Sequence, residues 1–166
     1  MTAVDRRSLL LEHLEEILSG LTITISTGVI PAGSIVRNRN ELPAEKVPGI
    51  IMLDADEVND PSVPPNPSGR NLAVGPRMMR MTPEIYVVLD VRKPANKNVG
   101  PDLNAARQQI LKAVLFDKTL QQIVGANGNV GYDGCVTDLA RNRTMQGQMG
   151  ISITFTYPFI PGELAL

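Results

Sequence analysis

The chain has 166 residues, a size typical of one domain, and 43% of them are hydrophobic, enough to build a core. Only 4% are aromatic and none is Trp, so we expect an aliphatic core. The formal net charge of -1 argues against general binding of nucleic acid through a basic surface, and no apolar stretch approaches the roughly 20 residues of a membrane-spanning helix. The start of the chain does not resemble a signal peptide, and the single cysteine, Cys135, has no partner for an internal disulfide. We therefore expect assembly in a reducing cytoplasm.

Charge is divided unevenly along the chain. Residues 1–60 hold five Lys and Arg against ten Asp and Glu, a net charge of -5. Residues 61–166 hold eleven against seven, a net charge of +4. This division predicts either two oppositely charged surfaces or, if folding mixes the two halves, none.

The first third of the chain predicts one amphipathic helix followed by short strands. Residues 2–18 predict the helix, with Thr2 as its N-cap. Its apolar face repeats every 3.6 residues and consists of Leu10, Leu14, Ile17, Leu18 and Leu21. Extended segments are expected at 21–26 and 34–37, and residues 49–54 predict a strand buried on both faces.

A proline-rich insert follows at residues 59–76, with five of the thirteen prolines. Proline at this density blocks both helices and sheet ladders, and a loop of this length is either functional or disordered. The next strand, 78–91, is interrupted by Pro83, so its first part is expected on a sheet edge or beyond the body. Residues 59–81 therefore predict a projecting arm, either ordered by a partner or an inert surface loop.

The second half of the chain predicts two helices and one clear strand. Residues 103–116 have an apolar stripe, and residues 117–124 predict a shorter helical segment. Residues 129–139 read as extended and turn-rich. Apolar and polar residues alternate over 148–157, which is typical of an antiparallel strand with one buried face, and Pro158 is expected to end it before a short tail, 158–166.

No residue pattern provides a catalytic, cofactor or metal site. His13 has Glu16 three residues later but no second histidine, so a solvated helix-face histidine is favoured over a metal ligand. The acids of residues 54–60 lack calcium-loop spacing and favour a solvated strand end. The glycines of residues 125–131 lack the lysine of a phosphate-binding loop and favour a turn, and Cys135 is expected to be buried and inert.

The arm contains the candidate partner contacts of this chain. Its arginines give it positive charge, which suits contact with DNA phosphates or with an acidic partner surface. These candidates are Arg70, Arg77, Met79, Arg80 and Met81. Solvated loop charges are the alternative.

The order of the predicted elements resembles the tail terminator, or tail completion, proteins of long-tailed phages, the group containing the lambdoid minor tail protein U. The resemblance covers nearly the whole chain and rests on order and pattern rather than on a sharp motif. It consists of the N-terminal helix, short strands, a long loop, a strand ending in Val91-Arg92-Lys93-Pro94, a helix opening at Asp102-Leu103, a segment centred on Leu120, a stretch containing Tyr132 and an alternating strand ending at Tyr157. The proline density of the insert and the 158–166 tail depart from the shorter members.

The resemblance implies one α+β domain over residues 1–166, with a mainly antiparallel mixed sheet, two main helices on one face and a long loop or hairpin arm. It further implies a virion protein of the tail or neck, not an enzyme, that forms a homo-hexameric ring at the head-proximal end of the tail tube. Its partners would be the tail tube protein and the head–tail connector or stopper, with DNA passing through the lumen without specific binding and no membrane involved.

Three alternatives remain at the level of sequence. Another neck component, such as a connector or head-closure protein, shares small α+β folds and ring symmetry. A small ligand- or metal-binding domain would use the acids of residues 54–60 or Cys135. A DNA-binding module is disfavoured by the net charge.

Overall fold

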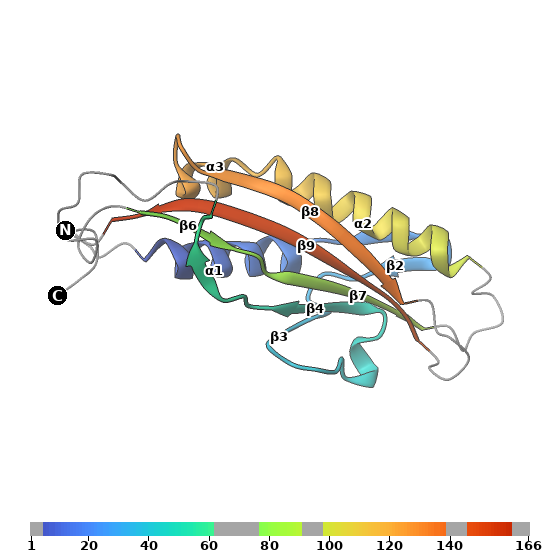
Figure 1. Ribbon diagram of the computed structural model, residues 1–166. Helices are drawn as coiled ribbons and strands as arrows, with labels where there is room; N and C mark the ends of the chain where they lie inside the picture. Colours follow the sequence, from blue (N-terminus) through green and yellow to red (C-terminus); the bar gives the residue numbers. More distant parts are fainter. Residues whose placement is uncertain (1–4, 62–76, 91–97, 139–145, 161–166) are drawn as a thin grey trace.

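The computed structural model describes residues 5–61, 77–90, 98–138 and 146–160 (Figure 1). The fold is α+β, as expected, with a mostly antiparallel mixed sheet. The described helices are α1 (Arg6–Gly20), α2 (Val99–Leu115), α3 (Lys118–Val124) and a short 3-10 turn, η1 (Ala44–Lys46). The described strands are β1 (Ile23–Ile25), β2 (Gly28–Ile30), β3 (Ile35–Arg37), β4 (Gly49–Leu53), β5 (Glu57–Asn59), β6 (Arg77–Met81), β7 (Glu84–Asp90), β8 (Asn129–Asp138) and β9 (Gln146–Phe159).

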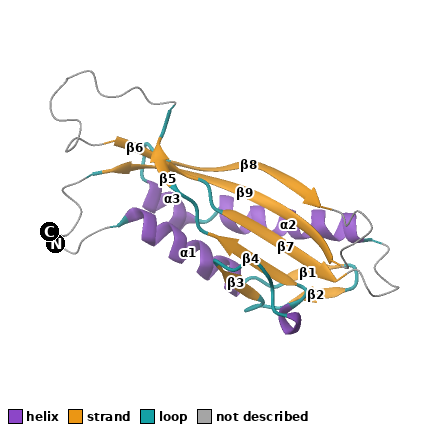
Figure 2. Ribbon diagram, turned by 60° about the horizontal axis from the view of Figure 1, so that its bottom comes forward, coloured by secondary structure: helices purple, strands orange, loops and turns teal. Residues whose placement is uncertain are grey.

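Strand β9 is the central strand of the main sheet. One side of it pairs with β7 and then, further along, with β6, while its other side pairs with β8. Beyond β7 come β4 and then β3, and beyond β6 comes β5. Every described pairing in this sheet is antiparallel except that of β3 with β4. Strand β8 is therefore the outermost strand along one long side (Figure 2).

The main core lies between the helices and one face of the sheet. Each of the three helices contributes buried residues to it, and β9 contributes every second residue, from Met149 to Tyr157, as its alternation predicts. A second cluster on the opposite face contains no helical residue; its buried members are Leu42, Ile51 and Val88. Strand β4 is thus buried on both faces, as expected, and all three helices lie on one face.

A hairpin that the sequence did not reveal is held beside α2. Strands β1 and β2 form a separate two-stranded sheet. The Gln109 side chain accepts from the Thr24 amide (2.9 Å) and donates to the Thr24 carbonyl (2.8 Å). The buried Asp102 carboxylate accepts from the Ser26 amide and hydroxyl, both at 2.9 Å. Two polar side chains of α2 therefore replace the neighbouring strand that β1 lacks.

Helix α1 begins later than expected. Its N-cap is Asp5, which accepts from the Ser8 amide and hydroxyl at 3.3 and 2.7 Å, and these bonds lower the Asp5 pKa. The predicted cap, Thr2, lies outside the described residues. The apolar face is confirmed, with Leu10, Leu14 and Leu18 buried.

Two expectations based on proline are wrong. Residues after Pro83 form β7, but the part before it is β6, which lies between β9 and β5 instead of on an edge. Pro83 falls in the gap between the two strands, where its carbonyl accepts from the Ile153 amide (3.3 Å). Pro158 lies within β9 and pairs with Met78; since β8 does not extend that far, the missing N–H breaks no ladder on that side.

Candidate interaction surface

Within the described ranges, no group of three or more His, Cys, Asp or Glu side chains is arranged to hold a metal ion. None of the helices described there is both long and apolar enough to cross a membrane. The candidate residues are therefore best examined as structural contacts and as surfaces.

His13 joins α1 to α3. Its Nδ1 lies 3.0 Å from Glu16 Oε2, and its Nε2 lies 3.1 Å from Asp117 Oδ1. Asp117 is also the N-cap of α3 and accepts from the Leu120 amide (2.8 Å). The expectation of a solvated histidine is wrong, because the side chain is only 23% exposed and bridges two elements. The two carboxylates lie at opposite ring nitrogens and do not converge on one point.

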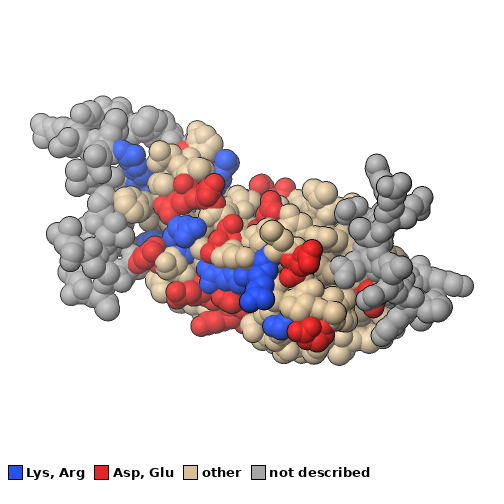
Figure 3. All heavy atoms as spheres, turned by 90° about the horizontal axis from the view of Figure 1, so that it is seen from below, with Lys and Arg blue, Asp and Glu red and all other residues tan. Residues whose placement is uncertain are grey.

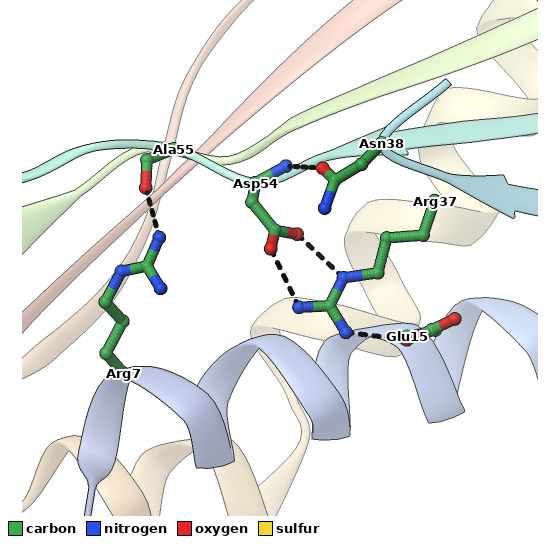
Figure 4. Close-up of polar contacts among 6 residues, drawn as sticks. All are labelled: Arg7, Glu15, Arg37, Asn38, Asp54 and Ala55. Carbon is green, nitrogen blue, oxygen red and sulfur yellow. Dashed lines mark hydrogen bonds and ion pairs between the residues drawn. The ribbon is translucent and has the colours of Figure 1, made fainter.

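Arg37, on β3, ties the sheet to α1 (Figure 4). Its Nε and Nη2 donate to the two carboxylate oxygens of Asp54 at 2.8 and 2.9 Å, and its Nη1 donates to Glu15 Oε2 at 2.8 Å. The guanidinium holds the pKa of Asp54 below its usual value, and the two carboxylates raise the pKa of Arg37 further, Asp54 having the larger effect. This side chain is fully engaged within the fold.

Helix α1 is also attached by Arg7. The Nη2 of Arg7 donates at 2.9 Å to the carbonyl of Ala55, which follows Asp54 between β4 and β5 (Figure 4). The predicted solvated strand end at residues 54–60 is therefore wrong for Asp54, which is ion-paired, and for Asp60, which is 8% exposed. Asp54 contributes to the attachment of α1 through Arg37, which also bonds Glu15 of that helix.

Gly125 and Gly128 form a turn, as expected, whereas Gly131 lies in β8 and pairs with Thr154. Gly125 ends α3 with a φ of 79°, and the Gly128 amide donates to the Gly125 carbonyl at 3.0 Å. A Cβ at Gly128 would lie 2.2 Å from the Val124 carbonyl oxygen and 2.5 Å from that of Thr156. Glycine is needed there because two backbone segments meet.

The predicted arm is only partly separate from the body. Arg77, Met79, Arg80 and Met81 all belong to β6, inside the sheet, whereas Arg70 lies outside the described residues. Met81 is 1% exposed and Met79 packs against the main core, so Met81 is no partner contact in this fold. Arg80 is exposed. The sequence pattern failed here because β5 and β6 pair with each other across the insert.

Basic and acidic side chains alternate over the face that carries α1, β3 and η1 (Figure 3). The pairs of Arg37 with Asp54 and Glu15 belong to this mixture. Folding therefore mixes charges on this face, which is the second of the two outcomes that the sequence left open.

Strand β8 carries an exposed mixed surface that sequence reasoning missed. Val136 is 77% exposed, Tyr132 is 38% exposed, and Cys135, expected to be buried, is exposed. Arg107 of α2 lies with its Cζ 5.8 Å from the centre of the Tyr132 ring and donates to the Tyr132 hydroxyl at 3.2 Å. The adjacent Cys135 thiol raises the pKa of the Tyr132 phenol.

The sheet face opposite the helices is lined along β9 by small polar residues, namely Gly150, Ser152, Thr154 and Thr156. Thr154 and Thr82 share a hydroxyl hydrogen bond of 3.1 Å. The Tyr86 ring lies across Gly150, since a Cβ there would lie 2.9 Å from Tyr86 Cε1, and the Tyr86 hydroxyl donates to the Glu84 carboxylate. The neighbouring strands add charge to this face, because Glu84 pairs with Ser152 and Arg80 pairs with Thr156, and both charged residues are exposed.

No protein-family model matches this chain, and no curated protein matches its sequence.

Proposed function

We propose that this chain is a structural virion protein, a tail terminator that forms a hexameric ring at the head-proximal end of the tail tube. The ring stops tube polymerisation and presents the surface for joining the head. The supporting observation is the one-sided architecture. All three helices cover one face of an antiparallel sheet, in the element order that carries the resemblance to tail terminators.

Ring closure requires a heterologous contact, in which one surface of a copy meets a different surface of the next. Exposed apolar side chains suited to such a contact occur on separate elements: Leu9 of α1 is 41% exposed, Val29 of β2 is 50% exposed, and Phe116 at the end of α2 is 76% exposed. Aromatic residues are frequent anchors of protein interfaces. Phe116 is therefore the first candidate contact between ring subunits.

The partners that follow from this function are the tail tube protein on one side of the ring and the connector or stopper on the other. DNA would pass through the lumen without specific binding, in keeping with the formal net charge of -1.

The test is the solution mass across a concentration series, alone and with tail tube protein. Six copies of 18.0 kDa give about 108 kDa. We expect that species, formed either by the free protein or on tube ends, and we expect it to be weakened in Phe116→Ser. A chain that stays a monomer with tube protein present contradicts the proposal. Binding to the connector alone would instead indicate a different neck component.

A further inference from the structure

Strand β8 has no second strand partner among the described residues, and its outer edge provides a second, separate surface. We propose that it joins two copies of this chain, β8 to β8, about a twofold axis centred on Val136. This pairing is isologous, whereas closure of a ring is heterologous, so the two contacts use different surfaces and can be tested apart. The inference therefore goes beyond the proposed ring and does not depend on it.

An unpaired strand edge is a template for another strand, and proteins usually guard it with charged side chains, proline, β-bulges or very short strands. The β3 edge is guarded in this way: Lys46 Nζ donates to the Ile35 carbonyl at 2.8 Å and to the Gly33 carbonyl at 3.4 Å. Strand β5, the other edge, has three residues. Strand β8 contains neither lysine nor proline, and its bulge lies between Tyr132 and Gly134; after the bulge it pairs only with β9 among the described strands.

Both faces of β8 are accessible near its C-terminal end. Val136 pairs with Gly150 and is 77% exposed on the face away from the helices. Cys135 and Thr137 pair with Ile151 and Met149, which face the helices, yet both are exposed. The helix layer therefore leaves this end of the strand uncovered, and Figure 2 shows β8 at the outer side of the sheet.

The register follows from a β-bulge and from charge. Pairing with β9 shifts between Tyr132 and Gly134, so regular pairing on the outer edge is restricted to the stretch after the bulge. A twofold axis at Val136 sets this valine against its own copy and sets Cys135 against Thr137. The backbone of residue 138 then pairs with that of Gly134, which has no side chain to oppose it. This self-complementarity identifies the occupant as a second copy.

The decisive experiment is disulfide trapping. With Cys135→Ser as background, Val136→Cys places one thiol per copy at the axis, where directly opposed strand residues come within disulfide reach. We expect a covalent dimer on a denaturing, non-reducing gel at high protein concentration. The matched control is Val58→Cys in the same background, on β5, where the valine is 47% exposed. Absence of the dimer, or equal dimer in the control, overturns the pairing.

A charge on the edge provides the second readout. Val136→Lys should halve the mass of the largest species in concentrated solution, from dimer to monomer or from paired rings to single rings, while Val58→Lys should leave it unchanged. Circular dichroism checks that both variants fold, as expected for exposed positions. An unchanged mass in Val136→Lys overturns the β8 pairing and leaves a 108 kDa ring untouched. If Val136→Lys loses the ring but Val136→Cys gives no trapped dimer, another strand occupies the β8 edge. That result also overturns the β8 pairing.

Discussion

Arg37 shows how one side chain fixes an edge strand to a helix. It lies on β3, which pairs only with β4 among the described strands, and it bonds two acids from different elements, Asp54 after β4 and Glu15 on α1. Its side chain is 26% exposed and that of Asp54 is 21% exposed, so solvent screens this pair less than an open surface pair. The edge of the sheet should therefore depend on it.

Replacing Asp54 by Asn should lower the free energy of unfolding by about 1–3 kcal/mol at pH 7, the range for hydrogen bonds to charged groups. The folded-state pKa of Asp54 is lowered, so its contribution is complete above about pH 5 and is lost as the pH falls below about 4. Urea titrations at pH 7 and pH 3 test this, and the difference between wild type and variant should shrink at pH 3. If the difference in free energy of unfolding were the same at both pH values, the substitution would have removed packing rather than a charge interaction. The exposed Asp56→Asn is the control.

Position 128 requires glycine because there is no room for a Cβ atom between two backbone segments. Because the carbonyl oxygens of Val124 and Thr156 would lie within 2.5 Å of an added Cβ, Gly128→Ala must move α3 away from β9. We expect a loss of about 2–3 kcal/mol, typical of overpacking. Thermal or urea unfolding measures it. Gly131→Ala, whose Cβ would meet only the Asn129 side chain below 3.4 Å, should cost far less; equal losses would contradict the argument.

At the scale of elements, the β1–β2 hairpin depends on α2. Asp102→Ala removes the acceptor of the Ser26 amide and hydroxyl and should cost about 1–3 kcal/mol. Amide hydrogen exchange gives the sharper readout: protection should fall at Ser26 and Thr24 while β9 amides keep theirs. The exposed Asn104→Ala on the same helix is the control. Uniform loss of protection would show that the hairpin is not a separate unit.

Substitutions at two neighbouring residues of β9 test which face of the sheet is buried. Ile153 is fully buried against the helices, whereas the next residue, Thr154, faces the opposite side. Ile153→Asp should cost more than about 4 kcal/mol or prevent folding, because it buries an unpaired charge. Thr154→Asp should cost much less, as measured by thermal unfolding. Similar losses in the two variants would show that the second face is also covered.

Elements whose pattern is local could be predicted from the sequence. The leucines of α1, the stripe of α2 and the alternation of β9 each record one buried face, so their positions followed within a few residues. The contacts of His13 with Asp117 and of Arg37 with Asp54 could not be predicted. Their partners lie 104 and 17 residues away along the chain, and no spacing rule connects them.

Elements defined by their neighbours could not be predicted. Residues 129–139 read as extended but turn-rich, since Gly131, Asp133 and Gly134 break the alternation, and pairing with β9 makes β8 one strand with a single bulge. The start of β6 read as an arm because of Pro83 and the insert before it. In both cases backbone pairing with β9 overrides local propensity, as strand formation often does.

For the whole molecule, the question is whether the insert serves the fold or the assembly. Its two ends are already adjacent, because Asn59 pairs with Met79 and the Asp60 amide donates to the Met78 carbonyl at 2.9 Å. Pairing of β5 with β6 therefore does not require the fifteen residues at 62–76. Replacing them by Asn-Gly, the preferred two-residue hairpin turn, should close β5 onto β6 without strain.

This shortened protein should keep its cooperative unfolding and a melting temperature near that of wild type, because no described core residue is removed. If the insert is the partner-ordered arm that the sequence analysis left open, the shortened protein should fail to form the 108 kDa species, alone or on tube ends. Thermal unfolding and light scattering on the same sample separate the two effects. A control with the same Asn-Gly turn followed by a 13-residue Gly-Ser linker tests length against sequence. Normal assembly by the shortened protein would assign the ring contacts entirely to the body, whereas an unfolded product would make the insert part of the fold.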